Sequence, residues 1–167
     1  NIGAFDTYFL KFTDTLPTGM ELAGGDTSSV KVTLAYTSDG NSYSTDITGN
    51  PSVSIGTSGQ RLVIAISDLK QVNPAVDKTA VVTVEYKAHL LDTAAIGQEG
   101  NQNSAVLTYA SDPVSTVAGS GSWDSPDPTG TASTLEGSHK TRTCTWKVDL
   151  QKVDKQTHVP LKGAKYT

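Results

Sequence analysis

Apolar and polar residues alternate with a period of two along most of the chain, and a helical period is hard to find. Alternation of this kind, interrupted by Gly, Pro, Asn and Asp, is typical of short β-strands with one buried face. The predicted strands span residues 5–13, 30–36, 42–47, 61–66, 79–90, 103–110 and 142–153. Only residues 68–77 have a pattern that would suit a helical turn. The sequence therefore predicts an all-β sandwich of short strands.

Residues 111–137 differ from the rest because Ser, Gly, Pro, Thr and Asp replace most of the apolar side chains. A segment of this composition buries too little apolar surface to fold alone, so we predict a long loop or linker. Apolar alternation returns in residues 142–153, and residues 161–167 begin another strand-like run. We expect a first domain over residues 1–141, and the connecting strand and start of a second domain over residues 142–167.

Charge and cysteine content exclude several classes of protein. The net charge is −4 and no Lys/Arg cluster occurs, so we expect no nucleic-acid partner. No apolar run approaches the length of about 18 residues that a membrane-spanning helix needs. Cys144 is the only cysteine, so the chain can form no disulfide within itself.

An aspartate occupies a position where the alternation predicts an apolar residue. Residues of one parity share a face of a strand, and Asp14 shares the parity of Tyr8, Leu10 and Phe12. A buried carboxylate is costly unless it is hydrogen-bonded, paired or protonated. The alternative is that the strand has already ended and Asp14 caps the turn that follows.

An asparagine and a lysine show the same anomaly. Asn103 shares the parity of Ala105 and Leu107, and Lys152 shares that of Trp146 and Val148. A buried amide must satisfy two donors and an acceptor, and burial disfavours the charged form of lysine. The alternatives are an Asn103 that bonds to local backbone and a Lys152 whose ammonium reaches water at the strand end.

One reaction would account for all three residue types. A neutral lysine amine can attack the side-chain amide of an asparagine, release ammonia and leave an isopeptide bond. A nearby protonated Asp would polarise the amide carbonyl and carry the proton. Such a bond cannot be reduced, which suits a chain without disulfides. It is a single-turnover self-modification, so we do not expect an enzyme.

Three segments resemble sortase-assembled major pilins of Gram-positive bacteria. Residues 12–20, FTDTLPTGM, are similar to the "TDTLPxGL" segment of the pilin middle domain. Residues 101–109, NQNSAVLTY, are similar to its "NxNxAxLxYSN" strand. Residues 150–166, from LQKVD to GAKY, are similar to "LxKVDxxTxxPLxGAxF", which opens a Cna B-type domain. The three matches follow the family's order along almost the whole chain.

The resemblance implies an Ig-like, isopeptide-forming middle domain followed by the first strands of a Cna B-type domain. Asp14 would be the acid/base, Asn103 the amide partner, and Lys152 the reactive lysine of the second domain. In the family the middle-domain lysine precedes the "TDTLP" strand, so the partner of Asn103 is expected before Asn1. The partner of Lys152 is expected after Thr167.

The resemblance also implies a function in the cell wall or fimbriae. The leading hypothesis is a structural pilus subunit, joined head to tail to identical subunits by sortase. The alternative is a module of a wall-anchored adhesin that binds a host protein or glycan, and a third is an accessory module of a secreted hydrolase. No cofactor is expected: His89, His139 and His158 lack metal-ligand spacing, and the carboxylates of residues 124–130 are expected in a solvated loop.

Overall fold

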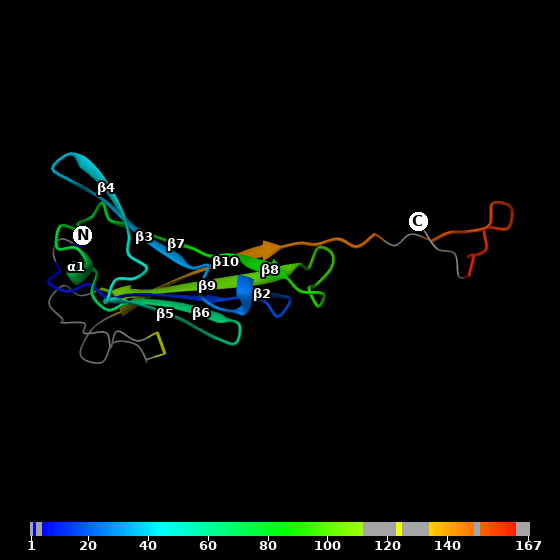
Figure 1. The fold of residues 1–167 in the computed structure, drawn as a ribbon, viewed down its shortest axis with the longest axis horizontal. Coiled ribbons are helices and arrows are strands. Elements are labelled where there is room, and N and C mark those ends of the chain that lie inside the picture. Colours follow the sequence, from blue (N-terminus) through cyan, green and yellow to red (C-terminus); the bar gives the residue numbers. More distant parts are fainter. Residues whose placement is uncertain (1, 3–4, 112–122, 125–133, 149–150, 163–167) are drawn as a thin grey trace.

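The protein is a β-sandwich with an extended C-terminal segment (Figure 1). This computed structural model describes residues 2, 5–111, 123–124, 134–148 and 151–162, without the side chains of residues 134–136. Its strands are β1 (Leu10–Thr15), β2 (Met20–Leu22), β3 (Lys31–Ser38), β4 (Asn41–Asp46), β5 (Val53–Ser58), β6 (Arg61–Ile66), β7 (Val81–Glu85), β8 (Ala88–Leu90), β9 (Asn101–Ala110) and β10 (Thr134–Thr143). A single α-helical turn, α1 (Leu69–Val72), follows β6.

Antiparallel pairing arranges these strands in three sheets. The largest has the order β10-β9-β1-β6-β5, and the second has the order β4-β3-β7. Strands β2 and β8 form a short third sheet. β1 lies between β9 and β6, so each of its residues has a directly paired neighbour on both sides. This central position decides the surroundings of Asp14.

The hydrophobic core lies between the two larger sheets. Leu62, Ile64 and Ile66 of β6 are at most 2% exposed, and they pack with Val32 and Leu34 of β3. Val82 and Val84 of β7 pack against the same cluster from the edge of the second sheet. Burying a branched aliphatic side chain contributes roughly 1.5–3 kcal/mol, so this interface supplies much of the driving force for folding.

The all-β prediction is confirmed, and several strand predictions need correction. The helical turn predicted within residues 68–77 is present, where the Asp68 carboxylate caps α1 by accepting from the Lys70 backbone N–H. The predicted strand 79–90 is divided into β7 and β8. β2 and β5 were not predicted, because β2 is short and Ser54 and Gly56 make the outer face of β5 weakly patterned.

The end of the predicted linker is wrong. Residues 134–137 belong to β10, which pairs with β9 over its full length from Thr134 to Thr143. Backbone pairing to β9 makes a strand of a segment whose polar composition gives no strand signal. Residues 112–122 and 125–133 of the predicted linker lie outside the described residues.

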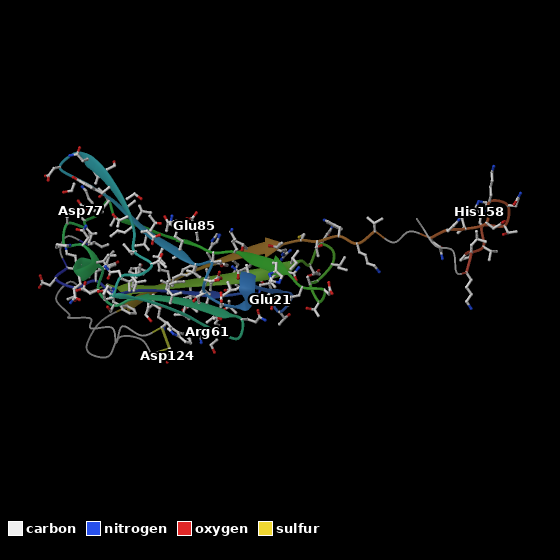
Figure 2. All side chains as sticks on the ribbon, viewed as in Figure 1. Glu21, Arg61, Asp77, Glu85, Asp124 and His158 are labelled. Atoms are coloured by element: carbon white, nitrogen blue, oxygen red, sulfur yellow. The ribbon has the colours of Figure 1, made fainter. Side chains whose placement is uncertain are left out.

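After β10 the chain leaves the sandwich. Residues 144–148 and 151–162 extend away from the body, and Figure 2 shows His158 at the far end of this segment. Trp146 and Val148 are 69% and 80% exposed. The predicted strand 142–153 is therefore wrong beyond Thr143: in the described part of the segment, Thr145 and Val153 form isolated bridges only. Alternation along the chain predicts which side chains would share a face, but a strand forms only where another strand is available to pair with it.

Candidate functional site

Asp14 is a buried carboxylate at the centre of the large sheet. It pairs with Leu62 of β6 on one side and with Ala105 of β9 on the other. Directly paired residues place their side chains on the same face, so Asp14 continues the core face of β1. Its residue exposure is 1%, and β1 runs through it to Thr15. The inward orientation predicted from parity is confirmed, and the alternative of a turn cap is wrong.

Asn103 lies on the same face of the neighbouring strand. It stands two residues before Ala105 on β9, which makes it a diagonal neighbour of Asp14. Diagonal neighbours across an antiparallel pair are within reach of longer side chains. The Oδ1 atom of Asn103 is buried and has no hydrogen-bond partner among the described residues.

A second asparagine on this face has a different role. Asn101 is 4% exposed, and its Oδ1 accepts a hydrogen bond from the Ala95 backbone N–H at 2.9 Å. Its Nδ2 donates to the carbonyl oxygens of Ala95 and Thr143 at 3.1 and 3.3 Å. Asn101 is thus fully used in fixing the preceding loop, whereas Asn103 keeps an unpartnered acceptor. Of the two amides in the "NxN" motif, Asn103 is the one that adjoins Asp14.

Tyr86 joins Asp14 and Asn103 from the opposite sheet. Its phenolic hydroxyl donates a hydrogen bond to Asp14 Oδ2. Burial raises the pKa of Tyr86, the hydrogen bond to Asp14 and the charge of that carboxylate raise it further, and a hydrogen bond with the Asn103 side chain lowers it. Tyr86 therefore stays protonated at neutral pH and acts as a donor to the carboxylate.

The sequence analysis missed Tyr86, although its signal was present. Val82, Val84 and Tyr86 share one parity within the segment predicted as a strand, and Val82 and Val84 pack on the core, so this parity would have placed the tyrosine inward. An inward tyrosine does not by itself indicate a functional role, because tyrosine is also a common core residue. Only the fold brings it to the carboxylate, across 72 positions in the chain.

The cluster of Asp14, Asn103 and Tyr86 has more acceptors than donors. Asp14 Oδ1 is also buried and unpartnered among the described residues. Most buried polar atoms in folded proteins are hydrogen-bonded, so two adjacent unpartnered oxygens are unusual. The arrangement is suited to receive one group that brings N–H donors, such as a lysine amine or ammonium.

An apolar groove of about 610 Å³ adjoins the cluster. Its floor includes Phe12 of β1 with Ala105 and Leu107 of β9, and its wall includes Val82 and Val84 of β7. Asp14 lies one inward position beyond Phe12, and Asn103 lies one beyond Ala105. The two polar residues therefore extend the floor of the groove at one end.

Lys152 lies apart from this cluster. It is exposed, and its backbone carbonyl accepts the N–H of Leu161 at 2.9 Å. Val153 pairs with Pro160, and Asp154 with Val159, so residues 152–161 form a small hairpin at the end of the extended segment. The expectation that Lys152 faces an apolar interior is not met within the described residues. Its role in a following domain stays a prediction.

The described residues contain neither a metal-binding cluster nor a membrane-spanning helix. The described residues contain no group of three or more His, Cys, Asp or Glu side chains placed to hold a metal ion. Of residues 124–130, whose carboxylates are expected in a solvated loop, only Asp124 lies in the described part of the chain. The same part of the chain has no helix that is both long and apolar enough to cross a membrane.

Comparison with solved structures finds the same fold in a bacterial surface protein. A backbone pilin of Streptococcus pyogenes, which has a modular three-domain structure, superposes with a TM-score of 0.60 at 17% identity. The match covers 93% of this chain and 31% of the pilin, so the chain spans about a third of that protein. The chain therefore has a pilin-like β-sandwich fold.

A second solved structure superposes less well on this chain. A collagen-binding domain of a surface protein of Erysipelothrix rhusiopathiae matches 82% of this chain and 39% of that one, with a TM-score of 0.44 and 19% identity. No protein-family model matches the sequence, and no curated protein matches it either.

Proposed function

We propose that this chain is a structural module of a cell-surface pilus of a Gram-positive bacterium, stabilised by an isopeptide bond that it forms itself. The pilin-like fold supports the first part of this proposal. The buried cluster of Asp14, Asn103 and Tyr86 supports the second, because it offers an amide, a carboxyl group and two unpartnered acceptors to an incoming amine. The cluster is the observation on which the proposal rests.

The proposed reaction joins a lysine Nζ to the side-chain carbon of Asn103. Proton transfer from the lysine ammonium to Asp14 gives a neutral amine and a protonated carboxyl group. The amine attacks the amide carbon while the Asp14 carboxyl group donates a hydrogen bond to the amide oxygen. Collapse of the intermediate returns the proton of the amine to the departing nitrogen. The products are one amide bond and one ammonia.

Tyr86 would hold Asp14 in the geometry that the reaction needs. Its hydroxyl occupies Oδ2 of the carboxyl group, which leaves Oδ1 to receive the proton and to face the amide. Burial and the neighbouring carboxylate raise the pKa of Tyr86, so the hydroxyl keeps its proton and remains a hydrogen-bond donor to Asp14. Lys152 would take the corresponding lysine role in a following Cna B-type domain, with its asparagine and acid supplied by that domain.

A cross-linked module suits a subunit that carries tension. A covalent bond between the strands of one domain resists unfolding and proteolysis, which depend on opening the sandwich. In a pilus, identical subunits would be joined head to tail by sortase. The alternative is a module of a wall-anchored adhesin, and covalent multimers on a denaturing gel of cell-wall extracts would separate the two: a ladder supports the pilus, and a single band contradicts it.

The mass of the complete protein tests the cross-link directly. Each isopeptide bond releases one ammonia, so about 17 Da should be missing per bond. Asn103→Ala should abolish one such deficit, measured against the mass expected for the variant sequence, and Asp14→Asn should abolish the same one because it removes the proton carrier. Gln102→Ala is the matched control, since Gln102 is exposed on the same strand and should leave the deficit unchanged. A native mass equal to that of the sequence would contradict the proposed chemistry.

A further inference from the structure

A small polar pocket lies beside the turn between β5 and β6. Its volume is about 180 Å³, and it shares no lining residue with the apolar groove. Residues of the turn and its flanking strands form one wall, and residues between Leu16 and Gly25 form the other. The backbone N–H of Leu16 donates to the carbonyl oxygen of Gln60 at 2.9 Å, which ties the two walls together. Sites for drug-sized ligands have volumes of about 300–1,000 Å³, so this pocket has room for a single small ring.

The pocket has an apolar floor and a polar rim. Leu16 and Leu22 line it and are each 5% exposed, because both also pack in the hydrophobic core. Thr57 and Gln60 add a hydroxyl and a side-chain amide to the lining. Small-ligand sites commonly combine an apolar surface with a few polar groups that fix the orientation of the ligand. A sugar ring matches this combination, since its faces carry C–H groups and its edge carries hydroxyls.

Arg61 and Glu21 bring opposite charges to the rim of the pocket (Figure 2). Both residues are exposed. The guanidinium of Arg61 has no hydrogen-bond or ion-pair partner among the described residues. Oε1 of Glu21 lies 2.9 Å from Nε2 of His89, so Oε2 of the same carboxylate is open to a ligand. The pocket therefore offers an unpaired guanidinium and an available carboxylate oxygen.

The separation of these two charges favours a sugar acid over an amino acid. No ion pair joins Arg61 to Glu21 in the part of the chain that the structure describes. A free amino acid carries its carboxylate and ammonium on one carbon atom, so it would contact both side chains only if they were close enough to pair with each other. A uronic acid instead carries its carboxylate and its hydroxyl groups on different carbons around the ring. Its carboxylate suits the paired N–H donors of a guanidinium, and a hydroxyl can donate to a carboxylate.

We propose that this pocket binds the terminal uronic acid residue of a glycan. The carboxylate of the sugar pairs with Arg61, and a ring hydroxyl donates to Oε2 of Glu21. The apolar face of the ring packs on Leu16 and Leu22. This binding is non-covalent and goes beyond the proposed cross-link. It does not depend on the buried cluster that the cross-link requires, because no residue of that cluster lines the pocket.

Methyl β-D-glucuronide tests the site on the 167-residue chain, and methyl β-D-glucopyranoside is the matched neutral ligand. The two sugars differ only at carbon 6, which is a carboxylate in the first and a hydroxymethyl group in the second. Amide NMR spectra report binding and show that each variant remains folded. We expect saturable shifts at residues 57–61 and near Leu16 and Leu22, with a dissociation constant in the millimolar range for the acid. The neutral sugar should bind at least about tenfold more weakly.

Substitutions on the rim separate the two contacts. Arg61→Gln should reduce the affinity for the glucuronide to that for the neutral sugar, and Arg61→Lys should keep only part of it, since an ammonium cannot form the bidentate pair. Glu21→Gln should weaken binding of both sugars, because a carboxylate is a stronger acceptor than an amide. His89→Gln removes the same ion pair but keeps the carboxylate, so both affinities should stay within about twofold. Arg142→Gln, at an exposed arginine outside the pocket, should also leave binding unchanged.

Three results would overturn the inference. The first is equal binding of the glucuronide and the neutral sugar. The second is equal binding of acetate and the glucuronide, which would show a carboxylate site with no place for the ring. The third is an absence of saturable shifts at residues 57–61 up to about 50 mM sugar. The mass of the complete protein decides the cross-link separately, so failure of one proposal does not imply failure of the other.

Discussion

The hydroxyl of Tyr86 donates a hydrogen bond to the carboxylate of Asp14, which links the two sheets of the sandwich through its core. Asp14 is on β1 of the large sheet, and Tyr86 follows β7 of the second sheet. The pair closes the polar end of an otherwise apolar interface. Because Asp14 is 1% exposed, water cannot replace the tyrosine without opening the sandwich.

Tyr86→Phe should therefore destabilise the chain by about 1–3 kcal/mol, the cost of leaving a buried acceptor without its donor. The ring and its packing are retained, so the loss reports the hydroxyl alone. Urea denaturation followed by circular dichroism measures the free energy of unfolding.

Tyr43→Phe is the matched control for the loss of a hydroxyl. Tyr43 is 45% exposed and stacks on Tyr36 with ring centroids 5.1 Å apart, a contact that phenylalanine keeps. Its effect on the free energy of unfolding should stay within about 0.5 kcal/mol. Equal effects of the two substitutions would show that the hydrogen bond to Asp14 contributes nothing.

Asn101→Ala should loosen the loop that precedes β9 and the exit of the chain from β10. The substitution removes three hydrogen bonds, to the Ala95 N–H, the Ala95 carbonyl and the Thr143 carbonyl. We expect a loss of about 2–3 kcal/mol of stability and faster hydrogen exchange at the Ala95 amide. Gln102→Ala, at an exposed position on the same strand, should change neither measurement. Unchanged exchange at Ala95 in the Asn101 variant would contradict the role given to its side chain.

Gly56→Ala should displace Trp123 from the outer face of β5. A Cβ atom at Gly56 would overlap the indole ring of Trp123, and the backbone N–H of Trp123 donates to Ser54 Oγ at 2.9 Å. Overpacking of this kind costs about 1–3 kcal/mol, and the tryptophan emission should shift to longer wavelength. Trp123 is the sole tryptophan in a Trp146→Phe background, which isolates the signal.

Gly49→Ala provides the matched substitution for this experiment. A Cβ atom there meets nothing within 4 Å, so its stability should be unchanged or slightly higher and its emission unaltered. An unshifted emission in the Gly56 variant would mean that the ring does not pack on this strand.

Strand parity predicted the orientation of Asp14 and Asn103 because both lie within strands that pair on the core side. The rule depends only on alternation along one strand, and β1 and β9 obey it. It failed for Lys152, since the segment around Trp146 has no neighbouring strand in the described chain. Parity therefore gave the correct orientation for Asp14 and Asn103 and the wrong surroundings for Lys152.

The remaining members of the site depend on contacts that are distant in sequence. Tyr86 reaches Asp14 only because the second sheet stacks on the first, and no local pattern encodes that stacking. β10 was missed because its polar residues take strand geometry from backbone pairing to β9. The groove could not be predicted for the same two reasons, because it lies between β7 of the second sheet and the inner face of β9 and β10.

Acid should weaken a turn in which Asp46 and Thr48 are hydrogen-bonded to each other. The Asp46 carboxylate accepts from the Thr48 hydroxyl at 2.6 Å and from its backbone N–H at 2.9 Å. These bonds, the hydroxyl bond first, lower the pKa of Asp46 below its ordinary value. A lowered folded-state pKa gives stability that is present above the unfolded-state pKa, near 4, and is lost as the pH falls through the folded-state value.

Thr48→Val should therefore raise the pKa of Asp46 toward its ordinary value, as measured by NMR titration of the carboxyl carbon. The Thr48 hydroxyl also accepts the backbone N–H of Val32 at 2.9 Å, so the same variant should expose that amide to faster exchange. Thr79→Val is the parallel case, because Asp77 is held in the same way by Thr79 and its pKa is lowered by the same cause. Each substitution should move the titration of its own aspartate and leave the other unchanged. A variant in which neither carboxyl titration moves would show that the hydroxyl bonds do not set these pKa values.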